Sequence, residues 1–534
     1  MATVHNPIIP GFNPDPSCIC VDGTFYLVTS TFLYYPGIPV YTSKDLQTWK
    51  QIGNVVNRPS QIDFSGCRLR PGTQLSGGLW APTIRHRDGV FYVTTTVVYP
   101  DKAYDDFSRW KNVIFSSTNP ETNEWSDPIY FDYPGYDTSL FWDDDGKVYV
   151  QGSFYWRIRE EISQFEIDLS SGKSLSGAPT KIWSGTGGKA PEAPHMYKRN
   201  GWYYLLIAEG GTEFGHCATM ARSRSVWGPF EPCPQNPILR AASHTALFQT
   251  IGHADIFSLE SSDFKDKERF YAVCLATRVI NEDCYPIGRE TCLMEVDWSG
   301  EWPVVPGGTL QESVKPPYPQ SSASQSTISE TDWVDVLRPP HHHLLYLRNP
   351  DVTCYNLQQG NQSGIILRAS SVPLTAPLGS PTFIGYRQSH LKFEAKVILN
   401  TSYMLPETEA GLAVYLDNEH HVTLGIHREE SDKGYLQEIR LTRVHPDHPE
   451  GELLACKATL TSLEEVVLHV TGEMDKYRFQ FSQNDKIEEL GTALGRDVSG
   501  GFTGVLIAIY GVHSGATKPE SKIHVREWNY RGIS

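Results

Sequence analysis

The stretch DGTFYLVTS, residues 22–30, places an Asp-Gly turn in front of a strand rich in aromatic and β-branched residues. Asp-Gly and Asn-Gly pairs in this position are strong hairpin signals. The phrase returns about every sixty residues, which marks an internal repeat. Its other copies are DGVFYVTTT at 88–96, DGKVYVQGS at 145–153, NGWYYLLIAEG at 200–210 and, less clearly, KERFYAVCLATR at 267–278.

A second phrase follows three of these strands and runs from a strand through Ser and a polar loop to a Trp and another strand. Its tryptophans are Trp49, Trp125 and Trp227. Each repeat is therefore a small multistranded sheet, and roughly sixty residues is a typical size for one β-propeller blade. Long helical periodicities are absent from this region. Five repeats predict an all-β fold whose N-terminal domain, residues 1–310, is a five-bladed β-propeller.

The second half of the chain has a different pattern. Residues 311–331 are rich in Pro and Ser without periodicity, which is typical of a linker. Alternating segments such as LKFEAKVIL at 391–399 and EVVLHVTG at 465–472 then follow one another. Period-two strands at this spacing predict a C-terminal β-sandwich of the jelly-roll type over residues 332–534.

Charge and hydropathy restrict the partners of the protein. The formal net charge of −16 argues against nucleic acids and anionic membranes, which attract dense Lys and Arg. No uninterrupted apolar run is long enough to span a bilayer. The N-terminal residues MATVHNPIIPG show no basic segment followed by an apolar stretch, as a secretory signal would. Two locations stay open: the cytoplasm, or secretion with a signal that was cut off and replaced by Met1.

Three acidic residues stand where a blade's innermost strand begins, and a propeller gathers such positions around a central funnel. Asp15 and Glu192 each lie between two prolines, which restrict the backbone on both sides. Asp137 has aromatic neighbours that suit a partly desolvated acid. The structural alternatives are a simple turn at Asp15, a turn or cap at Asp137 and a surface position at Glu192.

Two rigidly held carboxylates in different blades are what glycoside hydrolysis requires. One acid protonates the leaving oxygen, and one carboxylate attacks carbon or activates water. A third carboxylate nearby keeps the pKa of the acid high. Apolar neighbours around Glu192 favour a raised pKa, as a proton donor at neutral pH needs.

Five motifs, in order and spacing, resemble those of glycoside hydrolase family 43: GFNPDPS at 11–17, YDTSLFWDDDGKVY at 136–149, EAPHMYK at 192–198, GHADIF at 252–257 and PIGRET at 286–291. The two-domain plan is similar to the β-xylosidase branch, and the resemblance covers essentially the whole chain. It implies an inverting exo-glycosidase that removes xylose from the non-reducing end of β-1,4-xylo-oligosaccharides. The acid motif of the family often reads Glu-Gly-Pro where this chain has Glu-Ala-Pro, and a methyl group there should be tolerated.

The resemblance also implies a role for each catalytic candidate. By motif, Asp15 matches the general base that activates water, and Glu192 matches the general acid. Asp137 matches the acid that tunes the pKa of Glu192 and orients it. Arg289 matches an arginine that reaches the substrate hydroxyls and the tuning acid, with a buried structural ion pair as the alternative.

Further residues match the sugar subsite by resemblance. Trp80 and Phe32 match aromatic rings on which a sugar face stacks, and a loop around Phe502 in the C-terminal domain is the candidate to close one side. Core packing is the alternative for all three. The loop EGGTEFGH at 209–216 is expected to rim the pocket.

A metal is considered at one further position. His253 matches a histidine at the base of the funnel, which in some relatives helps to hold a calcium ion or a water. One histidine is a poor calcium site because calcium prefers oxygen ligands. We therefore expect that no cofactor is required, and Ca²⁺ at the propeller centre, with His253 as the metal-ligating candidate, stays open.

Other functions are kept as alternatives. An α-L-arabinofuranosidase, or a bifunctional enzyme, comes first because the two sugars present similar hydroxyls. A retaining fructosidase of the sister five-bladed clan would carry Asn-Asp-Pro-Asn, Arg-Asp-Pro and Glu-Cys-Pro motifs, which this chain lacks. A non-catalytic sugar-binding protein would have lost the acid or the base, and this chain keeps both. The expected partner is a xylo-oligosaccharide, and homo-oligomerisation stays open.

Overall fold

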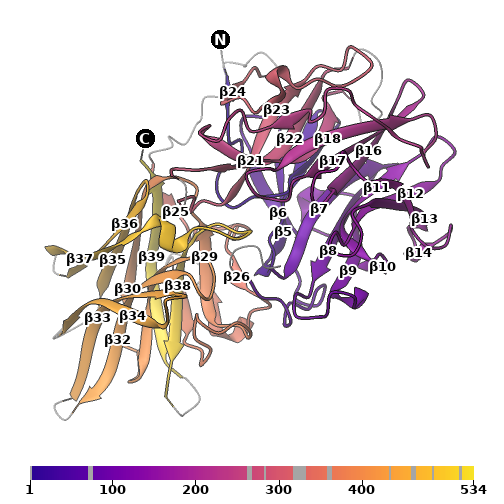
Figure 1. Cartoon of the computed structure of the whole chain (residues 1–534). Helices are drawn as coiled ribbons and strands as arrows, with labels where there is room; N and C mark the ends of the chain where they lie inside the picture. The colour runs from indigo at the N-terminus through magenta and orange to yellow at the C-terminus, as the bar shows by residue number, and fades with distance from the viewer. Residues whose placement is uncertain are drawn as a thin grey trace. The chain divides into compact units, whose positions relative to one another are not determined.

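The computed structural model is all-β, with strands and a few short 3₁₀ helices over the described residues (Figure 1). No helix in this part of the chain is long and apolar enough to cross a membrane. The structure describes residues 3–69, 76–260, 268–281, 284–316, 332–357, 364–431, 434–458, 465–483, 486–515 and 520–533.

Contacts within the chain define two units, and neither is continuous in sequence. The first comprises Met1–Ile62, Gly77–Val279 and Arg289–Ser322, and the second comprises Asp63–Ser76, Ile280–Gly288 and Ala323–Ser534. Two segments from within the predicted first domain, residues 1–310, therefore belong to the second unit. Both are held there by hydrogen bonds: Arg348 Nε donates to the Cys67 carbonyl over 2.7 Å, and the Tyr285 N–H donates to Ser499 Oγ over 3.0 Å.

The predicted linker, 311–331, is described as far as residue 316. Within it, β24 (Ser313–Val314) pairs with β1 (Val4–His5) in a two-stranded sheet, so the first part of this segment is ordered against the N-terminus. The rest of the predicted linker lies outside the described residues.

Five antiparallel sheets of three or more strands make up the described part of the first unit. Their strands, sheet by sheet, are β2 (Ser17–Val21), β3 (Thr24–Val28), β5 (Gly37–Ser43) and β6 (Lys50–Val56); β7 (Gly78–Arg87), β8 (Val90–Val98), β9 (Trp110–Ser117) and β10 (Ile129–Phe131); β11 (Gly135–Trp142), β12 (Val148–Phe154), β13 (Ile162–Asp168), β14 (Lys173–Ser174) and β15 (Thr180–Trp183); β16 (Glu192–Arg199), β17 (Trp202–Glu209), β18 (Cys217–Ser223), β19 (Glu231–Pro232) and β20 (Leu239–Arg240); β21 (Phe248–Ser258), β22 (Phe270–Arg278) and β23 (Arg289–Val296).

The repeated Asp-Gly and Asn-Gly pairs join the first two strands of their sheets. Asp22, Asp88 and Asn200 have φ of 48°, 51° and 52°, and the glycine after each is also left-handed. Two left-handed residues in sequence fit a type I′ turn, whose twist matches that of the flanking strands. The hairpins predicted from the repeat are therefore present at these three positions.

The first strands of the five sheets form a closed ring. Strand β2 contacts β7, β7 contacts β11, β11 contacts β16, β16 contacts β21, and β21 contacts β2 again. Segments that are far apart in sequence therefore meet around one axis.

Each of these first strands carries an extra residue at a corresponding position, and β21 carries a second one between Gln249 and Gly252. In β11, two residues between Tyr136 and Ser139 face one residue of β12, which is the pattern of a β-bulge. The same shift occurs in three other first strands, between Trp80 and Thr83, between Glu192 and His195, and between Gly252 and Asp255. Ahead of β2, the Ser30 N–H donates to the Pro14 carbonyl and Ser17 pairs with Val28, so two residues again face one.

The bulges turn side chains toward the axis. Four of the first extra residues have a left-handed φ: Asp15 at 55°, Asp137 at 52°, Ala193 at 53° and His253 at 49°. Non-glycine residues rarely adopt this conformation, and bulges re-aim side chains next to active sites. The sequence placed Asp15 and Asp137 at strand starts, and the structure shows that they occupy equivalent bulges.

The second unit contains two larger sheets. Their strands, in sheet order, are β27 (Tyr355–Leu357), β28 (Ile365–Arg368), β39 (Lys522–Gly532), β30 (Lys392–Asn400), β35 (Val466–Glu473), β36 (Lys476–Gln483) and β37 (Lys486–Leu494), with β25 (Val334–Asp335) on β39; and β29 (Thr382–Arg387), β38 (Leu506–His513), β31 (Thr408–Tyr415), β32 (His421–Ser431), β33 (Gly434–His445) and β34 (His448–Ala458). The remaining elements of the chain are β4 (Tyr34–Tyr35), β26 (Tyr346–Leu347), η1 (Phe107–Arg109), η2 (Pro120–Thr122), η3 (Pro306–Gly308), η4 (Val352–Cys354) and η5 (Gly495–Val498).

Both sheets of the second unit contribute to one buried apolar core. Phe393 and Val397 of the first sheet and Leu424 and Ile509 of the second belong to this core. In β30 buried and partly exposed residues alternate, as period-two patterning requires for a sheet with one buried face. The alternation seen in the sequence therefore places the core correctly.

A matched pair of substitutions tests this core. Ile509 is fully buried and Ile487 is 59% exposed, and both lie in strands of the second unit. Replacing Ile509 with Ala should lower the free energy of unfolding of that unit by about 2–5 kcal/mol, because a buried cavity forms. Ile487→Ala should cost far less, about 0.5 kcal/mol. Urea denaturation measures both, and equal costs would contradict the described core.

Candidate active site

The bulges collect side chains from different sheets. His253 Nδ1 lies 3.7 Å from Asp15 Oδ1 and 4.0 Å from Asp137 Oδ2. The Ala193 N–H donates to Asp137 Oδ2 over 3.1 Å, which links the start of β16 to β11. Asp15, Asp137, His253 and the strand start that carries Glu192 therefore form one cluster.

Asp15 is held as an ionised carboxylate. Arg289 Nη1 donates to its Oδ1 over 2.9 Å, and Ser30 Oγ donates to its Oδ2 over 2.6 Å. Burial alone would raise the pKa of Asp15, but the charges of Arg289 and His253 and the Ser30 hydroxyl outweigh burial and lower it. Asp15 is therefore ionised at neutral pH, in the form that can accept a proton.

Glu192 is shifted in the opposite direction. Burial and the negative charge of Asp15 raise the pKa of Glu192 to about 7. Burial, together with the charges of Glu192 and Asp15, also raises the pKa of Asp137 well above its usual range. Because these two carboxyls interact, they titrate as a pair, and the pair holds a proton at neutral pH.

Arg289 is held mainly by the Asp15 carboxylate. It donates to Asp15 and, over 3.3 Å, to Thr212 Oγ1, and its guanidinium lies 5.6 Å from the centre of the Phe32 ring. The resemblance placed this arginine beside Asp137 and the substrate hydroxyls. The structure shows an ion pair between Arg289 and Asp15; a buried ion pair was the alternative given for this arginine, but its partner was not predicted.

Aromatic rings line the neighbouring part of the cluster. The Phe32 and Trp80 rings lie 6.2 Å apart, and Trp80 lies 5.4 Å from Tyr136. The Tyr136 hydroxyl lies 3.4 Å from Glu192 Oε2. Phe32 is buried at 2% exposure, so packing fixes its ring, whereas Trp80 is partly exposed and can offer a ring face to a sugar.

Two further predictions concern Phe502 and the loop 209–216. Phe502 belongs to the second unit, in a bend between η5 and β38, and its part in a sugar site stays a prediction. The loop 209–216 ends at His216, whose Nε2 lies 3.9 Å from Glu192 Oε1. That loop therefore reaches the proposed acid itself, which the sequence analysis did not foresee.

Comparison with known proteins identifies the family. Residues 4–303 match the family described as "Glycosyl hydrolases family 43", and residues 340–531 match the "Beta xylosidase C-terminal Concanavalin A-like domain". The chain belongs to glycoside hydrolase family 43.

Relatives with related names cover nearly the whole chain. A non-reducing end α-L-arabinofuranosidase of Bacteroides ovatus is 34% identical over 96% of this chain and 92% of its own. A xylosidase/arabinosidase of Butyrivibrio fibrisolvens is 32% identical over 97% of each chain, and a β-xylosidase of Bacillus subtilis is 32% identical over 90% of this chain and 89% of its own.

Solved structures agree with this assignment. A family 43 protein of the Bacteroides ovatus xyloglucan locus superposes with a TM-score of 0.86 and 32% identity over the full length of both chains. A xylan β-1,4-xylosidase from Bacillus halodurans superposes with a TM-score of 0.86 and 27% identity over 99% of this chain and all of its own. Both units of this hydrolase therefore follow the family.

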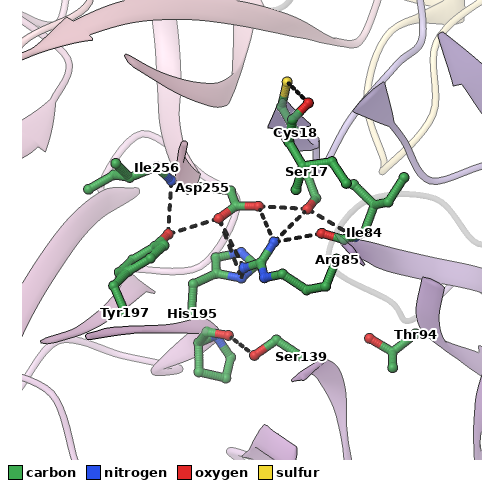
Figure 2. Close-up of polar contacts among 12 residues, drawn as sticks. Ser17, Cys18, Ile84, Arg85, Thr94, Ser139, His195, Tyr197, Asp255 and Ile256 are labelled. Atoms are coloured by element: carbon green, nitrogen blue, oxygen red, sulfur yellow. Dashed lines mark hydrogen bonds and ion pairs between the residues drawn. The ribbon is translucent and has the colours of Figure 1, made fainter. Parts of the chain in front are cut away.

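This family 43 hydrolase has a second layer of polar residues on its first strands (Figure 2). It is centred on the buried ion pair between Arg85 and Asp255, with oxygen–nitrogen distances of 2.8 and 3.1 Å. Ser17 Oγ and the Tyr197 hydroxyl also donate to Asp255, over 2.6 and 2.8 Å. Arg85 Nη2 lies 3.0 Å from His195 Nδ1.

The position of this layer follows from strand geometry. Side chains two residues apart on a strand point to the same side. Ser17, His195 and Asp255 each follow a first extra residue by two positions, so they lie one step further along the axis. Burial would raise the pKa of Asp255, but the charges of Arg85 and His195 lower it to about 2.

Beyond this layer the axis opens into a cavity of about 620 Å³. Its lining comes from all five first strands and includes Cys18, Arg85, Phe141, Lys198 and Phe257. The Arg85–Asp255 layer therefore lies between the carboxylates and this cavity and closes the inner end of the site.

The residues around His253 do not fit a calcium ion. Calcium takes about six to eight oxygen ligands. The two carboxylates near His253, Asp15 and Asp137, already accept hydrogen bonds, and the Arg289 guanidinium adds a positive charge. Among the residues that the structure describes, no group of three or more His, Cys, Asp or Glu side chains is arranged to hold a metal.

Breaking the axial ion pair tests its role in stability. Arg85→Met leaves the Asp255 carboxylate buried without its cation and should cost about 3–5 kcal/mol of unfolding free energy. Arg87→Met is the matched control, because the Arg87 side chain is 46% exposed and should cost about 0.5 kcal/mol or less.

The pH dependence of stability gives a second readout of the same variants. The folded pKa of Asp255, about 2, lies below the unfolded value of about 3.9. The pair therefore contributes fully above about pH 4, and its contribution is lost as pH falls toward about 2. Urea denaturation at pH 7 and pH 3 should show a smaller difference between wild type and Arg85→Met at pH 3. An equal difference would refute this account.

Proposed function

We propose that this family 43 hydrolase is an exo-acting, inverting β-xylosidase that removes xylose from the non-reducing end of β-1,4-xylo-oligosaccharides. The observation that carries the proposal is the opposite displacement of two carboxyl pKa values in one cluster, lowered at Asp15 and raised to about 7 at Glu192. One ionised carboxylate and one protonated acid at neutral pH are the two groups that glycoside hydrolysis requires, and inversion itself is proposed from the resemblance of the motifs to the family. Relatives named β-xylosidase support the choice of sugar.

Each proton has a donor and an acceptor in this mechanism. Asp15 takes a proton from water while the water oxygen forms a bond to the anomeric carbon. The bond from that carbon to the leaving oxygen breaks, and Glu192 gives its proton to that oxygen. Asp15 then returns its proton to solvent and Glu192 takes one up, so the enzyme is restored.

The neighbouring groups act on these two carboxyls. Arg289 and Ser30 hold Asp15 in place and keep it ionised. Asp137 accepts the Ala193 N–H and fixes the bulge that follows Glu192. Burial and the negative charge of Asp15 disfavour the ionised form of Glu192, which keeps the acid protonated. Trp80, with its partly exposed ring, is the proposed sugar platform.

We also propose that the ring of five sheets is a five-bladed β-propeller and that the second unit is a jelly-roll sandwich. The closed ring of first strands and the shared core of the two larger sheets support these assignments. The enzyme is proposed to act without a resident cofactor, because the donors around His253 do not suit calcium.

An α-L-arabinofuranosidase, alone or combined with xylosidase activity, is the second candidate. The specific observation in its favour is that the relatives include one named non-reducing end α-L-arabinofuranosidase and one named xylosidase/arabinosidase. The proposed chemistry of Asp15 and Glu192 is the same for both sugars, so the substrate is decided by the sugar pocket.

Substitution of the two carboxyls tests their roles. Asp15→Ala should reduce hydrolysis of both xylobiose and activated aryl xylosides by about 10²–10⁴-fold or more, because a base activates water for every substrate. Glu192→Gln should reduce xylobiose hydrolysis by a similar factor but spare aryl xylosides with very acidic leaving groups, which need little protonation. Steady-state kinetics on the two substrates measures both effects.

The fold of these variants is the necessary control. Unchanged circular dichroism and thermal melting would show that activity is lost through chemistry alone. Full activity of either variant on xylobiose would refute its assigned role.

The stereochemistry of the first product tests both the mechanism and the substrate. Proton NMR of fresh xylobiose digests should show α-xylose first, because inversion at a β-linkage gives the α-anomer. Early β-xylose would instead indicate a retaining nucleophile, whose carboxyl pair would be about 5 Å apart and not about 6.5–9.5 Å. No product from xylobiose, with hydrolysis of an aryl α-L-arabinofuranoside, would favour the second candidate.

A further inference from the structure

His216 is fixed beside the proposed acid in one defined tautomer. Its Nδ1 lies 2.8 Å from the Thr250 carbonyl oxygen, which can only accept, so Nδ1 carries the hydrogen. Burial lowers the pKa of His216 to about 4, so the ring is neutral at pH 7. Nε2 therefore presents a lone pair, buried and without a hydrogen-bond partner among the described residues, 3.9 Å from Glu192 Oε1.

Three parts of the first unit hold the ring in this place. A Cβ built on Gly252 would lie 2.5 Å from His216 Nε2 and 2.6 Å from Nδ1, so Gly252 leaves room for the ring. Thr250 is a β-branched residue with a left-handed φ of 53°, a strained conformation that turns its carbonyl to His216. Glu209, at the start of the loop, accepts hydrogen bonds from the Thr186 N–H and Thr219 Oγ.

A lone pair at this position distinguishes the two states of Glu192. A carboxylate oxygen gains nothing from facing a nitrogen lone pair. A protonated carboxyl can donate to it, after a shift of about 1 Å to normal hydrogen-bond length. A hydrogen-bond donor in the same place would do the opposite and favour the carboxylate.

Other charges act on both groups. Asp15, Asp137, Arg289, Lys189 and the Tyr136 hydroxyl act on Glu192. His253, Arg289 and Asp15 act on His216, and His253 and Arg289 disfavour a positive charge on its ring. These charges therefore help to keep the His216 ring neutral. Only the neutral ring has the Nε2 lone pair that can accept a hydrogen bond from protonated Glu192.

We propose that His216 is a positioning residue that keeps the general acid Glu192 protonated until the glycosidic bond breaks. Its Nε2 lone pair receives the Glu192 proton in the resting enzyme and releases it to the leaving oxygen when substrate binds. After cleavage the same lone pair faces a carboxylate and so favours the return of a proton from solvent. This inference rests on the proposed role of Glu192 as the acid.

Exchange of the lone pair for a donor tests the proposal. In His216→Gln the amide N–H₂ can donate to Glu192 and stabilise its carboxylate. The alkaline limb of kcat/KM on xylobiose, which falls as Glu192 loses its proton, should then move to lower pH by about one unit, the shift that about 1.4 kcal/mol produces. His244→Gln, at an exposed histidine of the same unit, should leave the limb in place.

A second variant reaches the same contact without removing the histidine. Gly252→Ala pushes the ring from its place and should shift the alkaline limb in the same direction. A uniform loss of activity in both variants, with an unchanged limb, would show that His216 is merely structural and would overturn the proposal.

A measurement on the unmodified enzyme needs no variant of His216. Nitrogen-15 NMR should show His216 as the neutral Nδ1–H tautomer from pH 5 to 8, and an Nε2–H tautomer or an imidazolium at pH 6 would overturn the proposal.

A failure of the proposed function can be distinguished from a failure of this inference. Full activity of Glu192→Gln on xylobiose would remove the acid role itself, whereas an inactive Glu192→Gln with an unmoved His216→Gln limb would refute this inference alone.

Discussion

The extra residue in each first strand is the constraint on which the active site depends. A regular strand would place alternate side chains toward the axis at fixed intervals, with no freedom to aim one of them. The bulge adds a left-handed residue at the same height in four sheets, and Asp15, Asp137 and His253 occupy three of these positions. The fourth, Ala193, offers its backbone N–H to Asp137. The bulges thus direct functional groups from several sheets toward one axis.

The uneven distribution of positive charge then gives the carboxyl groups different pKa values. Arg289 is bonded to Asp15, and the balance of burial and charge leaves Asp15 with a lowered pKa and Glu192 with a raised one. The second cation, Arg85, is held one layer further along the axis by Asp255. Because Arg85 is paired with Asp255, the two residues together carry little net charge. Arg289 is therefore the cation that pairs with the carboxylate of Asp15.

Much of this arrangement is visible in the sequence because its signals are local. The Asp-Gly and Asn-Gly turns, such as the one at Asp22, predict hairpins. The prolines around Asp15 and Glu192 indicate that the backbone at these acids is restricted. The Arg85–Asp255 pair joins residues 170 positions apart in the chain, and no local pattern records such a contact. A bulge also inserts one residue, so alternate counting that starts before the bulge, as at Glu192, assigns the wrong faces after it.

The remaining features depend on loops and on chain order. His216 reaches Glu192 from a loop whose glycines signal a turn but not its direction. The repeat likewise assigned every residue before 310 to the first domain, whereas Asp63–Ser76 and Ile280–Gly288 belong to the second unit. Membership of a unit is decided by contacts made later in the chain, such as those of Arg348 and Ser499.

That interleaved order has a consequence for biosynthesis. At roughly 5–20 residues per second, a ribosome needs roughly 10–40 s to add the roughly 200 residues that follow the first unit. The two inserted segments are made before this interval, and the side chains that bind them are made during it. The nascent chain must therefore keep two stretches of an already completed ring available for a domain that is still being synthesised.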